Sequence, residues 1–154
     1  MMKKLFLILI LTLATKMPVF AEIVPLQIAP TEVISTEHDE IQVGDWVQFE
    51  TTKDTYLDGK LYLKKGTPVV GVVDFYHPNG WCLDEAELRF KTFYFVNENN
   101  IKTEVNCTVN VNELSLIRND VKEQTKHFFK TVIRGSEIYI EPDTKTFNIF
   151  ITPL

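Results

Sequence analysis

The side chains that could do chemistry are concentrated between residues 74 and 85. This stretch holds Asp74, His77, Cys82, Asp84 and Glu85. Imidazole, thiolate and carboxylate groups are zinc ligands, and a histidine can activate a cysteine as a nucleophile. The spacing of these residues indicates neither a metal site nor a nucleophilic centre, because the stretch contains no C-x-x-C and no H-x-x-x-H pattern. We therefore predict no metal site and no cofactor, with His77, Cys82 and Asp84 as weak candidates for metal ligands.

Elsewhere the chain offers little catalytic chemistry. The remaining histidines are His38 and His127, and serine occurs only at positions 35, 115 and 136. No G-x-S-x-G elbow and no glycine-rich phosphate loop accompanies them. We predict no catalytic residue and no enzymatic activity. The alternative is an exported metalloprotein or hydrolase-like enzyme centred on His77, Cys82 and Asp84.

Three aromatic residues are candidates for binding: Trp46, Tyr76 and Trp81. Trp46 has the outward parity of a predicted strand, and Trp81 follows a turn at residues 78–80. Exposed aromatic side chains anchor protein interfaces. The same rings can instead pack against the wall of a barrel, and the sequence leaves both interpretations open.

Residues 1–21 predict a Sec-type signal peptide. Two lysines precede an apolar run of about ten residues, Leu5 to Ala14, and small or modest side chains occupy the −3 and −1 positions of a cleavage site after Ala21. The run is half of the roughly 20 residues that a membrane helix needs. We predict a periplasmic or secreted protein, with one β-rich domain over residues 22–154 and no integral membrane insertion after cleavage.

The charge balance is acidic. The chain of 154 residues has 16 basic and 21 acidic residues, a formal net charge of −5. The predicted signal peptide contains three lysines and no acidic residue, so the mature chain keeps 13 basic residues and has a net charge of −8. Phosphate binding needs clustered Lys and Arg, so we predict no nucleic-acid partner.

Strand patterns dominate residues 22–112. Residues 46–51 and 102–111 alternate between core-facing and water-facing side chains. The run 68–76 is apolar on both faces and predicts a central strand buried on both sides, in which Gly71 marks a bend or the close approach of another backbone. Asp58-Gly59 predicts a hairpin turn. A change of parity between Phe90 and Phe93 predicts a β-bulge near residues 91–92.

One segment has a helical period. Between residues 119 and 133, apolar positions recur at spacings of three and four, which predicts an amphipathic helix, with residues 130–134 as an alternative strand. Asp120 and Glu123 form its predicted capping box. The whole pattern predicts a mainly β fold: a small β-barrel or sandwich of about seven to nine short strands with one amphipathic helix near the C-terminus.

An oxidising compartment would allow a disulfide between Cys82 and Cys107. If the turn at residues 97–100 closes a regular hairpin, Cys107 lies opposite Phe90, and Cys82 lies a further eight residues along, roughly 26 Å away. Disulfide Cα atoms approach within about 7 Å. We therefore predict no disulfide; only a sharp fold-back around residues 81–85 would permit one.

Residues 44–73 carry the pattern G-D-x-V-x-F…D-G-x-L-x-L-x-K-G-T-x-V-x-G-x-V. This pattern resembles that of small exported bacterial β-domains, most of them uncharacterised. It is also weakly similar to the C-terminal β-barrel of TrbI-like scaffolds of conjugation and type IV secretion channels. The resemblance covers residues 41–111, and residues 135–144 resemble that family's final hairpin. It implies a structural or binding role and carries no functional residue to this chain.

These features predict an exported, non-enzymatic β-domain with a structural or protein-binding role in the bacterial cell envelope. Its expected partner is another envelope protein. A small-ligand carrier is a further alternative, although the large apolar residues expected inside the barrel favour a filled core over a cavity.

The cysteine prediction can be checked by counting thiols. The chain has two cysteines, and we expect both to react with a thiol reagent under denaturing, non-reducing conditions. If no thiol of the exported protein reacts, Cys82 and Cys107 are joined in a disulfide.

Overall fold

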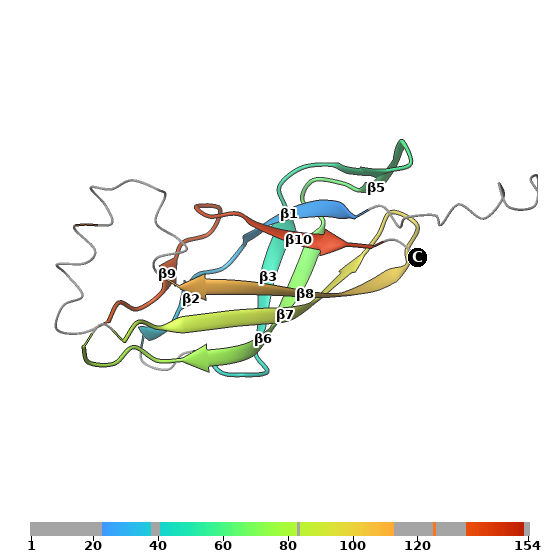
Figure 1. The fold of residues 1–154 in the computed structure, drawn as a ribbon. Helices are drawn as coiled ribbons and strands as arrows, with labels where there is room; N and C mark the ends of the chain where they lie inside the picture. Colours follow the sequence, from blue (N-terminus) through green and yellow to red (C-terminus); the bar gives the residue numbers. More distant parts are fainter. Residues whose placement is uncertain (1–22, 38–40, 83, 113–124, 126–134, 153–154) are drawn as a thin grey trace, which may run out of the picture.

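The structure is a computed structural model that describes residues 23–37, 41–82, 84–112, 125 and 135–152. These residues form ten strands (Figure 1). In chain order they are β1 (Val24–Pro30), β2 (Ile34–Ser35), β3 (Trp46–Thr51), β4 (Thr55–Leu57), β5 (Lys60–Leu63), β6 (Pro68–His77), β7 (Glu87–Val96), β8 (Lys102–Asn112), β9 (Tyr139–Ile140) and β10 (Phe147–Ile151).

Six strands form one antiparallel sheet in the order β10-β1-β3-β6-β7-β8. Its two edge strands, β8 and β10, lie beside each other, so that the sheet curves into a nearly closed barrel. Two further sheets have two strands each, β2 with β9 and β4 with β5. The prediction of a mainly β, barrel-like fold is confirmed.

The number of strands differs from the predicted seven to nine. One strand that the patterns did not predict is β2, which has two residues and pairs with β9 through Ile34 with Ile140 and Ser35 with Tyr139. A two-residue strand contains no full period of alternation, so a pattern search passes over it. It forms here because residues far apart in the sequence lie side by side.

The predicted amphipathic helix over residues 119–133 lies, apart from Thr125, outside the described residues. The elements that the described residues form, β1 to β10, are all strands, and they do not include this segment. Within the same residues, no helix is long and apolar enough to cross a membrane.

The predicted hairpin at Asp58-Gly59 is confirmed. Leu57 pairs with Lys60 across the turn, and both turn residues have positive φ, 49° for Asp58 and 73° for Gly59. Two positive φ angles define the turn whose twist matches that of paired strands, and Asp-Gly tolerates them.

The predicted β-bulge in β7 is also confirmed. Val72 of β6 pairs with Thr92, and the next residue, Val73, pairs with Phe90, so that Lys91 is an extra residue on β7. Lys91 is exposed, whereas Phe90 and Phe93 are both buried although they are three residues apart. The additional residue brings two aromatic side chains of opposite parity onto the core face.

The prediction that β6 is buried on both faces is wrong. Val69 and Val73 are buried in the core, whereas Val70 and Val72 are half-buried and Phe75 is exposed. A strand of a single-layered antiparallel barrel has one packed face and one solvated face. The outer valines therefore belong to the surface.

The centre of the core is a cluster of aromatic rings around Phe49 of β3. Its ring meets those of Phe90, Phe93 and Phe147 edge to face, with centroids 5.4, 6.1 and 6.3 Å away. Gly71 of β6 lies beneath two of them: a Cβ atom built there would be 2.8 Å from the Phe49 ring and 2.9 Å from the Phe93 ring. The predicted close approach to Gly71 therefore comes from side chains and not from another backbone.

We expect Gly71→Ala to destabilise the fold by about 1–3 kcal/mol, because the added methyl group overlaps two buried rings that have no free volume to enter. Urea unfolding measures this change. Gly59→Asn is the matched control, since that glycine has open space around it and asparagine tolerates its positive φ. Equal stability of Gly71→Ala and the parent chain would contradict the close packing described for Gly71.

Candidate functional site

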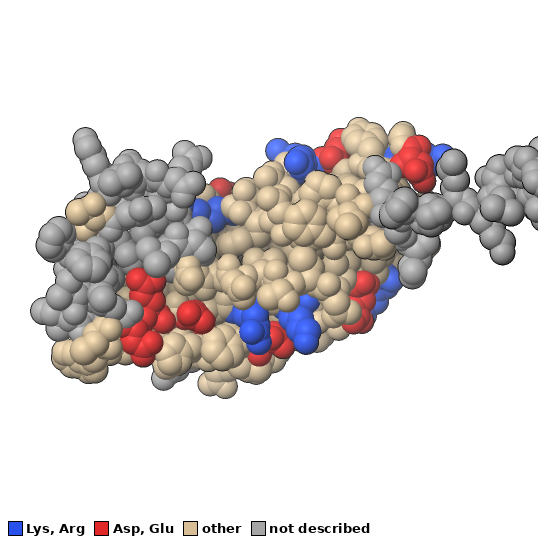
Figure 2. Space-filling model, viewed as in Figure 1, with Lys and Arg blue, Asp and Glu red and all other residues tan. Residues whose placement is uncertain are grey.

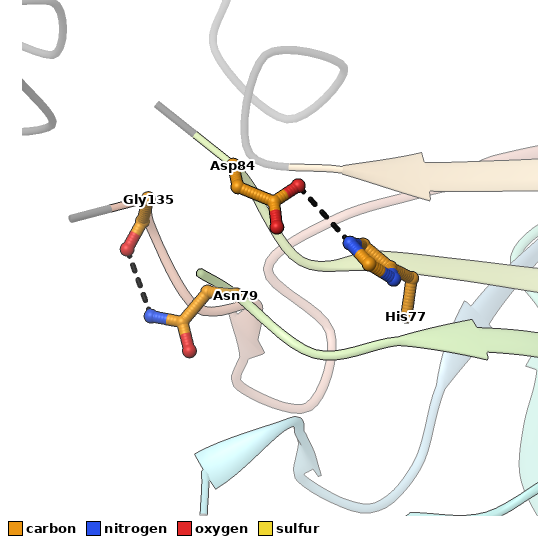
Figure 3. A network of polar contacts seen from close by, with 4 residues as sticks. All are labelled: His77, Asn79, Asp84 and Gly135. Carbon is orange, nitrogen blue, oxygen red and sulfur yellow. Dashed lines mark hydrogen bonds and ion pairs between the residues drawn. The ribbon is translucent and has the colours of Figure 1, made fainter. Parts of the chain in front are cut away.

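The structure brings together two of the three weak metal-ligand candidates. His77 is the last residue of β6, and Asp84 lies in the loop that leads to β7. The His77 Nε2 atom is 3.0 Å from Asp84 Oδ1, and both side chains are about half exposed (Figure 3). This contact closes the base of the loop over residues 78–86.

Backbone groups fix the same loop. The Gly80 N–H donates to the Asp84 carbonyl at 2.7 Å, and the Gly135 N–H donates to the Gly80 carbonyl at 2.9 Å. The Asn79 side-chain amide donates to the Gly135 carbonyl at 2.8 Å (Figure 3). A Cβ atom at Gly135 would overlap the Asp84 backbone. The loop and residue 135 therefore fit together only because this position has no side chain.

A metal or nucleophilic centre needs more than this pair of side chains. Cys82 is exposed and its thiol is free. Asp74 lies apart from the histidine and pairs with Arg89, whose Nη2 atom is 2.6 Å from Asp74 Oδ2. Within the described residues, no three His, Cys, Asp or Glu side chains are grouped closely enough to hold a metal ion. The contact between His77 and Asp84 joins the end of β6 to the loop before β7.

The two cysteines occupy different environments. Cys107 packs against the core from β8, and both thiols are free. The predicted pairing of Cys107 with Phe90 is wrong, because Phe90 pairs with Val109. The hairpin loop is longer than expected, because Val96 pairs with Lys102 and Asn97 Oδ1 accepts the N–H groups of Asn99 and Ile101. Between Phe90 and Thr92 the pairing shifts by one more residue, which is inserted on β8.

The three aromatic binding candidates do not form one patch. Tyr76 packs against the core, and its hydroxyl donates to the Thr36 carbonyl at 3.3 Å. Trp81 is 74% exposed in the loop after β6, and Trp46 is 69% exposed at the start of β3. The outward position predicted for Trp46 is observed, and Tyr76 has a packing role.

Trp46 borders a groove on the outer face of β3, β6 and β7. In this part of the sheet, Trp46 pairs with Val72, and Val70 pairs with Tyr94. The groove has a volume of about 760 Å³, and its apolar lining continues to Val96. On the far side, the Lys102 ammonium lies 5.5 Å from the centre of the Tyr94 ring. The result is an exposed apolar surface with a tryptophan at one end.

The sequence pattern indicates an outward Trp46 but does not indicate the other groove residues. Val70 and Val72 were assigned to the core, because a run that is apolar at every position gives no parity signal. Tyr94 and Val96 do have outward parity after the β7 bulge, so the change of parity at residues 91–92 could have identified them.

A second hollow of about 680 Å³ lies where the barrel edges meet, lined by residues of β8 and β10 that include Val105 and Phe150. Figure 2 shows that charged side chains on the face viewed in Figure 1 lie mainly toward its margins, while its middle, over β8 and β10, carries few of them. The interior itself is filled by the aromatic cluster around Phe49. The hollows are therefore surface features.

No protein-family model, curated protein or solved structure matches the chain.

The fit between Gly135 and the loop can be tested. We expect Gly135→Ala to lower the free energy of unfolding by about 1–3 kcal/mol and to speed proteolytic cleavage within residues 78–86, because backbone atoms must move to admit the methyl group. Ser136→Ala is the neighbouring control. Unchanged cleavage in Gly135→Ala would contradict the proposed fit between Gly135 and the loop.

His77→Gln should change the free energy of unfolding by less than about 1 kcal/mol, since the contact of His77 with Asp84 is exposed.

Proposed function

We propose that this protein is an exported, non-enzymatic β-domain that binds another protein of the bacterial cell envelope, in the periplasm or outside the cell. The binding surface is the outer-face groove next to Trp46. The signal-peptide pattern supports export, and the resemblance to small exported β-domains supports a binding or structural role.

The exposed groove at Trp46 is the observation that carries this proposal. A tryptophan that is 69% exposed beside half-buried valines leaves apolar surface in contact with water. Contiguous apolar surface of this kind marks interaction sites, and tryptophan is the residue most enriched among those that dominate binding energy. A partner that covered Trp46 and the valines would remove this surface from water.

The charge of the chain favours a protein partner over nucleic acid. Acidic residues outnumber basic ones by 21 to 16 in the full sequence. This balance repels phosphate chains at long range. Polypeptides offer both the apolar side chains and the cationic groups that such a surface can accept.

An exported metalloprotein or hydrolase-like enzyme is the second candidate, because His77 and Asp84 are in contact. It would use His77 as a base that is oriented by Asp84, with Cys82 as the nearest thiol in the sequence. Addition of zinc to the purified protein distinguishes the two candidates. A rise in melting temperature that His77→Gln abolishes would favour the metal site, and an unchanged melting temperature would favour the binding domain.

Photo-crosslinking in the bacterium tests the proposed surface. We place p-benzoylphenylalanine at position 70, in the groove, and expect a light-dependent adduct of discrete mass with an envelope protein. Trp46→Ala should reduce the adduct about tenfold or more, since loss of a tryptophan that anchors an interface costs about 2 kcal/mol or more of binding free energy.

The control places the same crosslinker at position 56, where Tyr56 is exposed on the β4–β5 hairpin. No adduct of the same mass should form there. Trp46→Ala must keep the parent melting temperature for the comparison to count. An adduct that forms equally at both positions, or that survives Trp46→Ala unchanged, would overturn the proposed surface.

A further inference from the structure

A smaller hollow adjoins the apolar groove on the other side of Trp46. It has a volume of about 280 Å³, and its lining includes Glu32, Asp45 and Trp46. We name this hollow the acidic notch. Trp46 lines both hollows, so the apolar groove and the notch that contains Glu32 and Asp45 adjoin at this residue.

Backbone N–H groups hold both carboxylates in place. Glu32 Oε1 accepts the Gln48 N–H at 2.7 Å, and the Thr31 N–H donates to the Gln48 carbonyl at 3.0 Å just after β1 ends. Asp45 Oδ2 accepts the Gln42 N–H at 2.7 Å. The two side chains are therefore positioned before any ligand arrives, which lowers the entropic cost of binding.

Neither carboxylate has a cationic partner among the residues that the structure describes. The ion pairs there join His77 to Asp84 and Arg89 to Asp74. Glu32 and Asp45 are both exposed. They present two negative charges in the hollow that Trp46 also lines, an arrangement that favours a cation.

We propose that the occupant of this surface is an extended segment of the partner polypeptide that combines apolar side chains with a lysine or arginine. The apolar side chains lie in the groove over Val70 and Val72. The basic side chain passes Trp46 and enters the acidic notch. This inference rests on the proposed function and specifies the chemistry of the partner.

Charge complementarity argues for this occupant over other apolar ligands. Anionic lipid headgroups and phosphate chains would meet two fixed carboxylates and be repelled. A purely apolar segment would leave the notch unused. A cation next to Trp46 gains from both carboxylates and from the ring, and the apolar groove fixes the register of the segment along the sheet.

A phage-displayed library of random linear peptides, about twelve residues long, provides the probe. Selection on the wild-type protein should enrich sequences with a lysine or arginine next to a run of apolar residues. The most enriched sequence is then synthesised with a fluorescent label, and its Kd is measured by anisotropy. Enrichment of acidic sequences, of sequences without charge bias, or of none at all would overturn the inference.

The variant Glu32→Gln/Asp45→Asn tests the notch. The amide oxygens still accept the backbone N–H groups, so only the charge is lost. We expect this variant to bind the peptide about three- to tenfold more weakly at about 50 mM salt, and the difference to shrink strongly at about 500 mM. Asp58→Asn, on the β4–β5 turn, is the matched control and should bind as the wild type does. An equal Kd for the double variant and the wild type at low salt would overturn the role of the notch.

The two proposals can fail separately. If Trp46→Ala abolishes the envelope adduct at position 70 while the charge variant forms it as the wild type does, the binding function stands and the basic segment is wrong. If the peptide binds but Trp46→Ala has no effect on its Kd, both the groove and the notch are wrong as its site.

Discussion

The fold depends on the packing of two phenylalanine rings over the backbone of β6 at Gly71. Phe49 comes from β3 and Phe93 from β7, the two neighbours of β6 in the sheet. Their rings lie so close to the Gly71 Cα that a side chain there would collide with both. Because β6 leaves this space, the strands on either side can curve toward each other and bury their aromatic residues at one point. Edge-to-face contacts with Phe90 and Phe147 complete the cluster.

The bulge in β7 follows from the same requirement. Phe90 and Phe93 cannot both face the core in a regular strand, because their spacing of three residues puts them on opposite faces. The unpaired Lys91 restores the parity and sends Tyr94 and Val96 to the outer face. The bulge therefore completes the core on one side of the sheet and supplies two walls of the groove on the other.

The outer groove exists because the barrel has a single layer of strands, whose outer faces no second layer covers among the described residues. The inner faces of β3, β6 and β7 pack against the aromatic cluster. On their outer faces, Trp46 is exposed and Val70 and Val72 are half-buried. Exposed apolar residues that no described element covers are costly in solution and useful at an interface. The proposed binding function connects this surface to the acidic notch beside it. The loop held by His77 and Asp84 lies at the far end of β6 and takes no part in the groove.

Local sequence patterns are enough to predict the class of fold and several local features. Strand parity, the Asp58-Gly59 turn and the β7 bulge are set by neighbouring residues, so they can be predicted from local patterns. The outward position of Trp46 has the same origin. Three further features could not be predicted from local patterns: which face of β6 is buried, where Cys107 lies along the β7–β8 hairpin, and which candidate residues are in contact. Each of these depends on contacts between strands, and an apolar run such as residues 68–76 fits either burial pattern until its neighbours are placed. The groove and the notch arise in the same way, because β1, β3, β6 and β7 bring together residues that no spacing in the chain relates.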